Sequence, residues 1–411
     1  MKKTLQLIGI ISLVLVFSCS TDKFPEQGTW RGALQIGDED SPEEIAFNFE
    51  ITGETQENIS IIIRNAGEKI NVNSIRITSD SLFFKMPVFD SEFRLKIKSG
   101  RLEGRWYNYA NGEDYYMQFI ANHGTNERYP VETDAEYNIS GKWETIFGSD
   151  SKRSSKAIGE FKQDGNIVTG TFITETGDYR FLEGIISGNK MTLSCFDGAH
   201  SFLFTANILE DNLMEGMFKP GKRGGQEWRA IRNENATIGD PYSLTYLKEG
   251  YDNFEFSFPD EDGINVSLND ERYLNKVVIV QIMGSWCPNC MDETVFLSEL
   301  YEKYHDQGLE IIGLAYEKAK ETEQIWKNIK RLKNFSGAKY PFLYAGTSNK
   351  KQAAETLPML NHILSFPTTI YIDKKGEIQK IFTGFMGPGT GEHYETHLKE
   401  INELLEDLLS E

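Results

Sequence analysis

Two cysteines stand three positions apart in the stretch GSWCPNC, residues 284–290. Cys287 and Cys290 follow the apolar run KVVIVQIM and precede a segment rich in helix formers. A pair with this spacing either supplies two of the four ligands of a zinc ion or forms a redox dithiol. A zinc site would need a second pair, but the histidines are scattered, and His393 and His397 are expected on a solvated helix face. The pair is therefore interpreted as a redox dithiol that cycles through a disulfide, with no metal and no cofactor.

The position of the pair indicates which thiol reacts first. Cys287 would be the N-cap residue of the helix, where free backbone N–H groups and the positive end of the helix dipole stabilise a thiolate. Pro288 suits the first helical position, because no N–H partner is needed there. Cys287 is therefore the expected nucleophile, and Cys290, one turn into the helix, is expected to resolve the mixed disulfide.

Strands and helices alternate around the pair from about residue 240 to residue 411. The run KVVIVQIM is typical of a central strand buried on both faces, and Leu297, Leu300 and Tyr304 follow it at helical spacing. Further strands are expected at LEIIGLAY, YPFLYA, TTIYID and IQKIFTG, with helices between them and a closing helix at the end. This order predicts an α/β domain with a mixed sheet flanked by helices.

The sequence WCPNC between a strand and a helix, followed by SFPTTIYID, resembles the thioredoxin superfamily, specifically the exported TlpA/ResA-like thiol-disulfide oxidoreductases. The resemblance covers roughly residues 240–411 and includes the entry region FSFPDEDGINVSLND. It implies a thioredoxin-like fold in which Pro367 is a cis-proline opposite the cysteines. It also implies that Trp286, Phe366, Pro367 and Thr368 contact the substrate.

The resemblance further implies a catalytic role for Glu293, three residues after the second cysteine. This carboxylate could tune thiol acidity and relay a proton, or it could merely stabilise the first turn of the helix. The sequence departs from the family at several points. Gln281 replaces the buried aspartate of ordinary thioredoxins, Asn289 stands where the family usually has proline, and Val295 replaces a later proline. These departures leave the reduction potential open.

The preceding half of the chain is predicted to be all-β, in two β-rich units over residues 28–125 and 138–235. Apolar and polar residues alternate strictly in IAFNFEIT and FRLKIK, which indicates antiparallel strands with one buried face. Cys195 would share such a face with Met191 and Leu193, so it is expected to pack as a small hydrophobe.

The two units are interpreted as a duplicated antiparallel β unit. The interval from Trp30 to Trp143 agrees with the interval from Gly104 to Gly216 to within one residue. The general rhythm of a β-meander could produce the same agreement, so this alternative stays open.

The first residues, MKKTLQLIGIISLVLVFSCS, combine two lysines with a short apolar core, as in a secretory signal. Ser18 before Cys19 resembles the lipobox of bacterial lipoproteins. Residues 1–19 are therefore expected to be a lipoprotein signal peptide with Cys19 as the lipidated residue; an ordinary signal peptide is the alternative. The mature protein is expected in the cell envelope, facing the periplasm and lipid-anchored to a bacterial membrane.

A formal net charge of −19 argues against a nucleic-acid partner.

The sequence predicts an exported thiol-disulfide oxidoreductase that reduces the disulfides of envelope proteins and is recharged by a membrane thiol electron donor. The direction rests on the resemblance alone. One alternative is a disulfide oxidase or isomerase with the same site. Another is an envelope binding protein whose β-rich region carries the main function.

Overall fold

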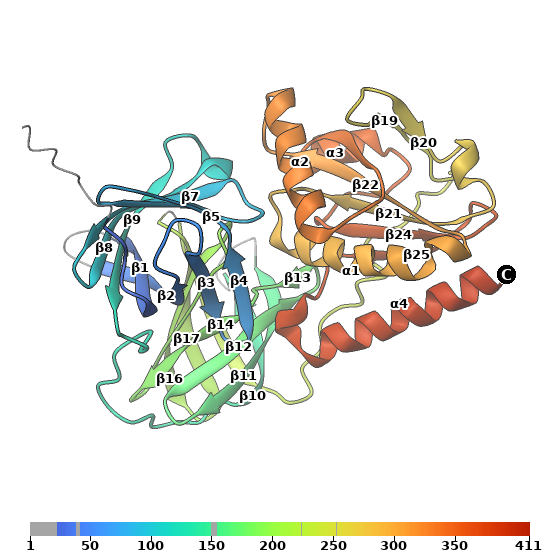
Figure 1. Ribbon diagram of the computed structural model, residues 1–411. Coiled ribbons are helices and arrows are strands. Elements are labelled where there is room, and N and C mark those ends of the chain that lie inside the picture. The colour runs from blue at the N-terminus through green and yellow to red at the C-terminus, as the bar shows by residue number, and fades with distance from the viewer. Residues whose placement is uncertain (1–22, 38–41, 149–153, 223, 252) are drawn as a thin grey trace, which may run out of the picture.

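The computed structural model describes residues 23–411 except 38–41, 149–153, 223 and 252. The expected signal peptide and Cys19 lie outside the described residues. In the described part of the chain, two antiparallel β units are followed by an α/β domain (Figure 1). None of the helices in this described part is both long and apolar enough to cross a membrane.

The first β unit, as far as the structure describes it, is a nine-stranded sheet in the order β4-β3-β2-β1-β9-β8-β7-β6-β5. Strand β7 shows why it forms: Phe93, Leu95 and Ile97 are buried, and the basic residues between them are exposed. The strands are β1 (Gly28–Gly37), β2 (Pro42–Thr52), β3 (Ser60–Asn65), β4 (Glu68–Val72), β5 (Ser74–Thr78), β6 (Ser81–Lys85), β7 (Ser91–Lys98), β8 (Arg101–Asn108) and β9 (Tyr116–His123).

The second β unit also has nine strands among the described residues, in the order β11-β10-β18-β17-β16-β15-β14-β12-β13. An additional pairing joins β11, at one end of this order, to β12, the last strand but one at the other end, so the sheet curls into a barrel. The strands are β10 (Gly141–Phe147), β11 (Ser155–Asp164), β12 (Ile167–Thr174), β13 (Gly177–Asp178), β14 (Leu182–Ser187), β15 (Lys190–Phe196), β16 (Ser201–Glu210), β17 (Leu213–Pro220) and β18 (Gln226–Arg232).

Equivalent positions in the two sheets support the predicted duplication. The first strand of each unit pairs with its second and its last strand. Trp30 and Trp143 are fully buried in these first strands, and each indole N–H donates to the carbonyl four residues earlier. Gly104 and Gly216 lie in the last strand but one, where a side chain would overlap a carbonyl oxygen of the neighbouring strand.

The two β units share a core. Phe196 of β15 stacks on Phe47 of β2 with ring centroids 4.5 Å apart. The side-chain amide of Asn65 donates to the Phe196 carbonyl at 2.9 Å and accepts from its N–H at 3.2 Å. Ile185 and Leu203 are buried in the same cluster. The second unit therefore completes the core of the first.

Cys195 belongs to the core of the second unit. It is fully buried in one apolar cluster with Met191 and Leu193, as expected for a small packed hydrophobe. Burial raises the pKa of its thiol well above the ordinary value.

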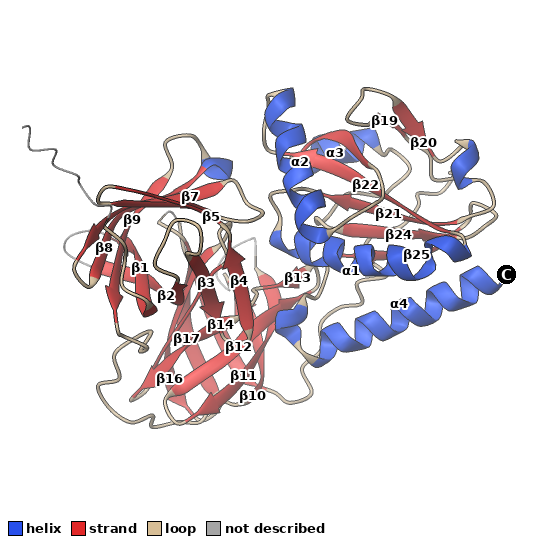
Figure 2. Cartoon of the chain, in the orientation of Figure 1, coloured by secondary structure: helices blue, strands red, loops and turns tan. Residues whose placement is uncertain are grey.

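The C-terminal domain is built on a five-stranded mixed sheet, counted over the described residues, in the order β23-β22-β21-β24-β25. Every residue of central strand β21 is buried; β21 pairs in parallel with β22 and antiparallel with β24. The predicted α/β domain is confirmed, and Figure 2 shows the α-helices around this sheet. Its elements are β19 (Ser257–Pro259), β20 (Asn265–Ser267), β21 (Val277–Met283), α1 (Pro288–Tyr304), β22 (Leu309–Glu317), α2 (Thr322–Ser336), β23 (Phe342–Thr347), α3 (Lys350–Thr356), β24 (Thr368–Ile372), β25 (Ile378–Thr383) and α4 (Glu392–Ser410).

Helix α4 corrects the expectation of a solvated histidine pair. His397 is only 5% exposed because it lies on the apolar face of α4, its ring 4.2 Å from that of Phe382. Burial lowers its pKa to about 4, so it is neutral at pH 7. His393 is half-buried and contacts Glu160 of the second β unit at 2.7 Å.

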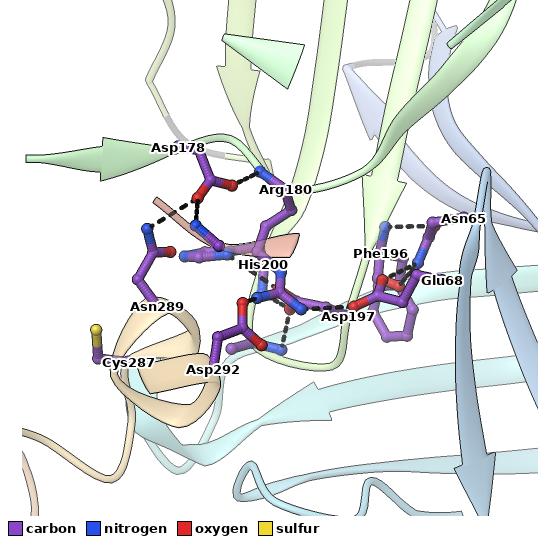
Figure 3. A network of polar contacts seen from close by, with 12 residues as sticks. Asn65, Glu68, Asp178, Arg180, Phe196, Asp197, His200, Cys287, Asn289 and Asp292 are labelled. Carbon is purple, nitrogen blue, oxygen red and sulfur yellow. Dashed lines mark hydrogen bonds and ion pairs between the residues drawn. The ribbon is translucent and has the colours of Figure 1, made fainter. Parts of the chain in front are cut away.

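A buried guanidinium group joins both β units to the C-terminal domain (Figure 3). Arg180, two residues after β13, is 2% exposed. It forms ion pairs with Glu68 of β4 at 2.5 Å, with Asp197 at 3.4 Å, and with Asp292 of α1. Helix α1 is thus fixed relative to the β units, because separating these groups would leave buried charges unpaired.

A second contact joins the first β unit to helix α2. Arg331 donates to the Val88 carbonyl at 3.3 Å and pairs with Asp90 at 3.4 Å. Phe89, between these residues, is buried against the core of the C-terminal domain.

Replacing Arg180 by methionine should lower the free energy of unfolding by about 3 kcal/mol, because its buried carboxylates would lose their partner. The matched variant Arg229→Met removes an ion pair with Glu215 whose side chains are 53% and 51% exposed. It should cost less than about 1 kcal/mol. Urea unfolding followed by tryptophan fluorescence measures both; an equal loss would contradict the role given to Arg180.

Candidate redox site

Helix α1 begins at Pro288, with Cys287 as its N-cap residue, so the predicted helix start is confirmed. The Cys290 backbone N–H donates to the Cys287 sulfur, with 3.3 Å between N and Sγ. This bond uses one of the N–H groups that have no partner inside the first turn of a helix. Both cysteines carry free thiols. The arrangement stabilises negative charge on the Cys287 sulfur.

The two thiols differ in their access to solvent. Cys287 is 7% exposed, whereas Cys290 is completely buried. Burial, followed by the hydrogen bond with Cys287 and its charge, raises the pKa of the Cys290 thiol well above the ordinary value. Cys290 is therefore protonated and shielded while Cys287 meets solvent.

The Phe366–Pro367 peptide bond is cis, as predicted, and it lies beside Cys287. The Cys287 thiol donates to the Phe366 carbonyl, with 3.3 Å between Sγ and O. The Trp286 ring meets the Phe366 ring edge-on at 5.8 Å, and its indole N–H donates to the Tyr316 carbonyl at 2.9 Å. Trp286, Phe366 and Pro367 are thus gathered around the sulfur.

Thr368 occupies a different position from these neighbours. Its side chain is fully buried, and its hydroxyl donates to the Ser365 carbonyl at 3.0 Å. This buried hydrogen bond stabilises the turn that contains Phe366 and Pro367.

Glu293 is buried between a strand glutamine and a strand threonine. Gln281 Nε2 donates to one carboxyl oxygen at 2.8 Å, and the Thr369 hydroxyl donates to the other at 2.7 Å. Burial raises the pKa of Glu293 to about 7, although both hydrogen bonds lower it. A carboxyl group with this pKa can accept or donate a proton near neutral pH.

Gln281 and Thr369 are supporting residues that sequence reasoning did not assign to the site. Gln281 also donates to the Cys290 carbonyl at 3.3 Å, so it links the cysteine helix to the buried carboxyl. A signal was present, because a glutamine inside the apolar run KVVIVQIM must find polar partners when the strand is buried.

Asn289 accounts for one departure from the family pattern. Its side-chain amide donates to the Phe385 carbonyl at 3.1 Å and to Asp178 of the second β unit at 3.5 Å. A proline has no such donor, so the asparagine provides a contact between the cysteine motif and the β region. Nearby, burial raises the pKa of Asp292 to about 7, opposed by the charge of Arg180.

Lys318 and Lys350 bring positive charge near Cys287. Burial lowers the pKa of each lysine, and interaction with the charge of Cys287 raises it. Lys318 Nζ lies 4.3 Å from the centre of the Trp286 ring, and Lys350 donates to the Leu364 carbonyl. Over the described ranges, no group of three Cys, His, Asp or Glu side chains is arranged to hold a metal ion.

Comparison with known proteins assigns the C-terminal domain to a protein family. The family described as Redoxin matches residues 250–398. The thiol-disulfide oxidoreductase ResA of Geobacillus thermodenitrificans is 30% identical over 147 residues, which cover 36% of this chain and 74% of ResA. ResA of Bacillus anthracis is 31% identical over 146 residues, covering 36% of this chain and 74% of that protein.

Solved structures also match part of the chain. A thiol-disulfide oxidoreductase from Bacteroides fragilis is 22% identical, with a TM-score of 0.27, and the match covers 36% of this chain and 96% of that one. The alignment with the ResA proteins concerns about a third of this chain, and the Redoxin match begins after both β units. The chain thus belongs, through its C-terminal domain, to the TlpA/ResA-like thiol-disulfide oxidoreductases of the thioredoxin superfamily.

Proposed function

We propose that this oxidoreductase reduces disulfide bonds of proteins in a bacterial cell envelope, with Cys287 as the nucleophile and Cys290 as the resolving thiol. The asymmetry of the pair carries this proposal. Cys287 keeps 7% of its surface exposed and has a backbone N–H directed at its sulfur, whereas Cys290 is completely buried with a raised thiol pKa. This difference suits attack by the more accessible thiol and release by the buried one.

The electrons move in two exchanges. The Cys287 thiolate attacks one sulfur of the substrate disulfide, forming a mixed disulfide and releasing the other substrate sulfur as a thiolate. Cys290 then loses its proton and attacks the Cys287 sulfur, which releases the second substrate sulfur. The substrate gains two electrons and takes up two protons, and the enzyme ends with a Cys287–Cys290 disulfide.

Glu293 is suited to accept the proton that Cys290 must lose. It lies one helical turn further along α1, it is buried, and its charge contributes to the raised pKa of Cys290. With a pKa of about 7, part of the Glu293 population is ionised at neutral pH. The buried carboxylate then offers a base where bulk water does not reach.

The surroundings of Cys287 suit an extended substrate segment. The half-buried Trp286 and the buried Phe366 and Pro367 lie beside the sulfur, and the buried Thr368 supports their turn. A membrane thiol electron donor would return the pair to the dithiol form. The signal-like N-terminus supports export, with Cys19 as the lipid anchor; this part rests on the sequence and on the family resemblance.

Trapping experiments test the roles of the cysteines. Cys290→Ser should accumulate mixed disulfides with envelope proteins, because the resolving attack is lost. Cys287→Ser should accumulate few, since the remaining thiol is buried and protonated. Cys195→Ser, which changes a packed thiol, serves as the control and should resemble the wild type. Non-reducing gels show the adducts, and the opposite pattern for Cys287 and Cys290 would reverse the assignment.

A pH profile tests Glu293. The resolving step should accelerate as pH rises through about 7, where the carboxyl loses its proton and becomes a base. Glu293→Gln should remove this inflection and slow resolution by about tenfold or more. The matched variant Glu299→Gln, an exposed carboxylate on the same helix, should keep it. Rapid-quench measurement of mixed-disulfide decay gives the rates; an unchanged profile in Glu293→Gln would leave this residue a structural role only.

The reduction potential of the cysteine pair tests the direction of electron flow. A reductant of this type should equilibrate with glutathione or dithiothreitol buffers near about −270 mV, whereas an oxidant lies near about −120 mV. Mass spectrometry of alkylated Cys287 and Cys290 across such buffers reports the oxidised fraction. A value at the oxidising end would replace the reductase proposal by an oxidase.

A further inference from the structure

The hairpin that joins β12 to β13 in the second β unit lies against the redox site. We name residues 174–178 the cover hairpin. Thr174 pairs with Gly177 across the turn, and the Thr174 hydroxyl donates to the Gly177 carbonyl at 2.8 Å. Figure 1 shows β13 between the β units and the start of α1.

One side of the cover hairpin contacts the residues between the two cysteines. Asp178 accepts a hydrogen bond from the Asn289 amide at 3.5 Å and one from the Gly387 N–H at 2.7 Å. Figure 3 shows Asp178 above Asn289, with Cys287 at the adjacent end of the helix. Gly177 packs so closely on the Asn289 amide that a side chain on Gly177 would overlap it.

The tip of the cover hairpin contacts the segments around the cis-proline. The Thr176 carbonyl accepts a hydrogen bond at 3.4 Å from the hydroxyl of Ser365, which precedes Phe366. A side chain on Gly384 would overlap the Thr176 backbone, and the Gly384 N–H donates to the Pro367 carbonyl at 2.8 Å. Backbone therefore meets backbone here, and no space remains for a substrate segment on this side of Cys287.

The Arg180 cluster holds the cover hairpin in place. The backbone N–H of Arg180 donates to the Asp178 carboxylate at 2.6 Å. The Arg180 guanidinium group forms ion pairs with Asp292 on α1 and with Glu68 on β4. Arg180 is buried, and the side chains of Glu68 and Asp292 are only 12% and 11% exposed, so moving the hairpin away would expose or unpair these charges. The cover hairpin is thus a fixed part of the surface that a substrate meets.

We propose that the cover hairpin determines which disulfides reach Cys287, admitting small or extended substrates and excluding compact folded proteins. This proposal rests on the reductase function proposed above. Trp286, next to Cys287, is half-buried, and the exposed Lys318 lies over its indole ring, so the approach to the sulfur is open here. A small molecule or an extended segment that carries a disulfide needs only that side to reach Cys287. A folded protein presents a broad surface around its disulfide, and that surface would collide with the hairpin.

Substrate selectivity tests the proposal with oxidised glutathione and insulin as probes. In the full chain, Asp178→Ala removes the hydrogen bonds to Asn289 and Gly387, and deletion of Glu175 and Thr176 shortens the tip. Each variant should raise kcat/KM for insulin by about tenfold and leave that for oxidised glutathione within about twofold. Asp164→Ala, in the exposed turn at the other end of β12, is the matched control and should change neither.

A second measurement needs no turnover. N-ethylmaleimide should modify Cys287 of the wild type at least about tenfold faster than a maleimide carrying a long polyethylene glycol chain, and the hairpin variants should narrow this difference. Equal rates for the two reagents in the wild type, or equal changes for insulin and glutathione in a folded variant, would overturn the proposal. If the wild type reduced neither oxidised glutathione nor insulin, the reductase function itself would be rejected instead.

Discussion

The position of helix α1 relative to the β units depends on one buried guanidinium group, that of Arg180. Arg180 is surrounded by carboxylates from the first β unit, the second β unit and helix α1. Burial alone would raise the pKa of Asp197, but His200 and Arg180 bring it down to about 2, whereas burial raises that of Asp292 to about 7. The cluster therefore need not hold every carboxylate ionised at once, which reduces the repulsion among them. The positions of Asn289 and Cys287 relative to the β region follow from this arrangement.

The parts of the site that sequence reasoning could predict depend on neighbours along the chain. The N-cap role of Cys287 follows from a strand, a proline and a helix in succession, and the structure has that order. The run of β21, apolar except for Gln281, indicated a strand covered on both faces. The period-two alternation of the β units revealed their strands, and the recurring tryptophans and glycines indicated the duplication.

The remaining features arise from contacts between residues far apart in sequence. Hydrophobic periodicity shows that a position is buried, but it does not identify the partner. His397 illustrates this: its spacing from His393 suggested a solvated face, yet the rings of Phe382 and Phe385 cover it. Asn289 could be recognised as a departure from the family, but its partner Asp178 lies 111 residues earlier. No local pattern joins these two residues.

The shared core of the β units has a consequence for how the chain can be divided. Phe196, Ile185 and Leu203 lie in the middle of the second unit, yet they pack among the aromatic side chains of the first. A fragment that ends near residue 125 would leave Phe47, Phe93 and Trp106 facing water where Phe196 now covers them. The two β units are therefore not exchangeable modules, because side chains of the second unit complete the core of the first.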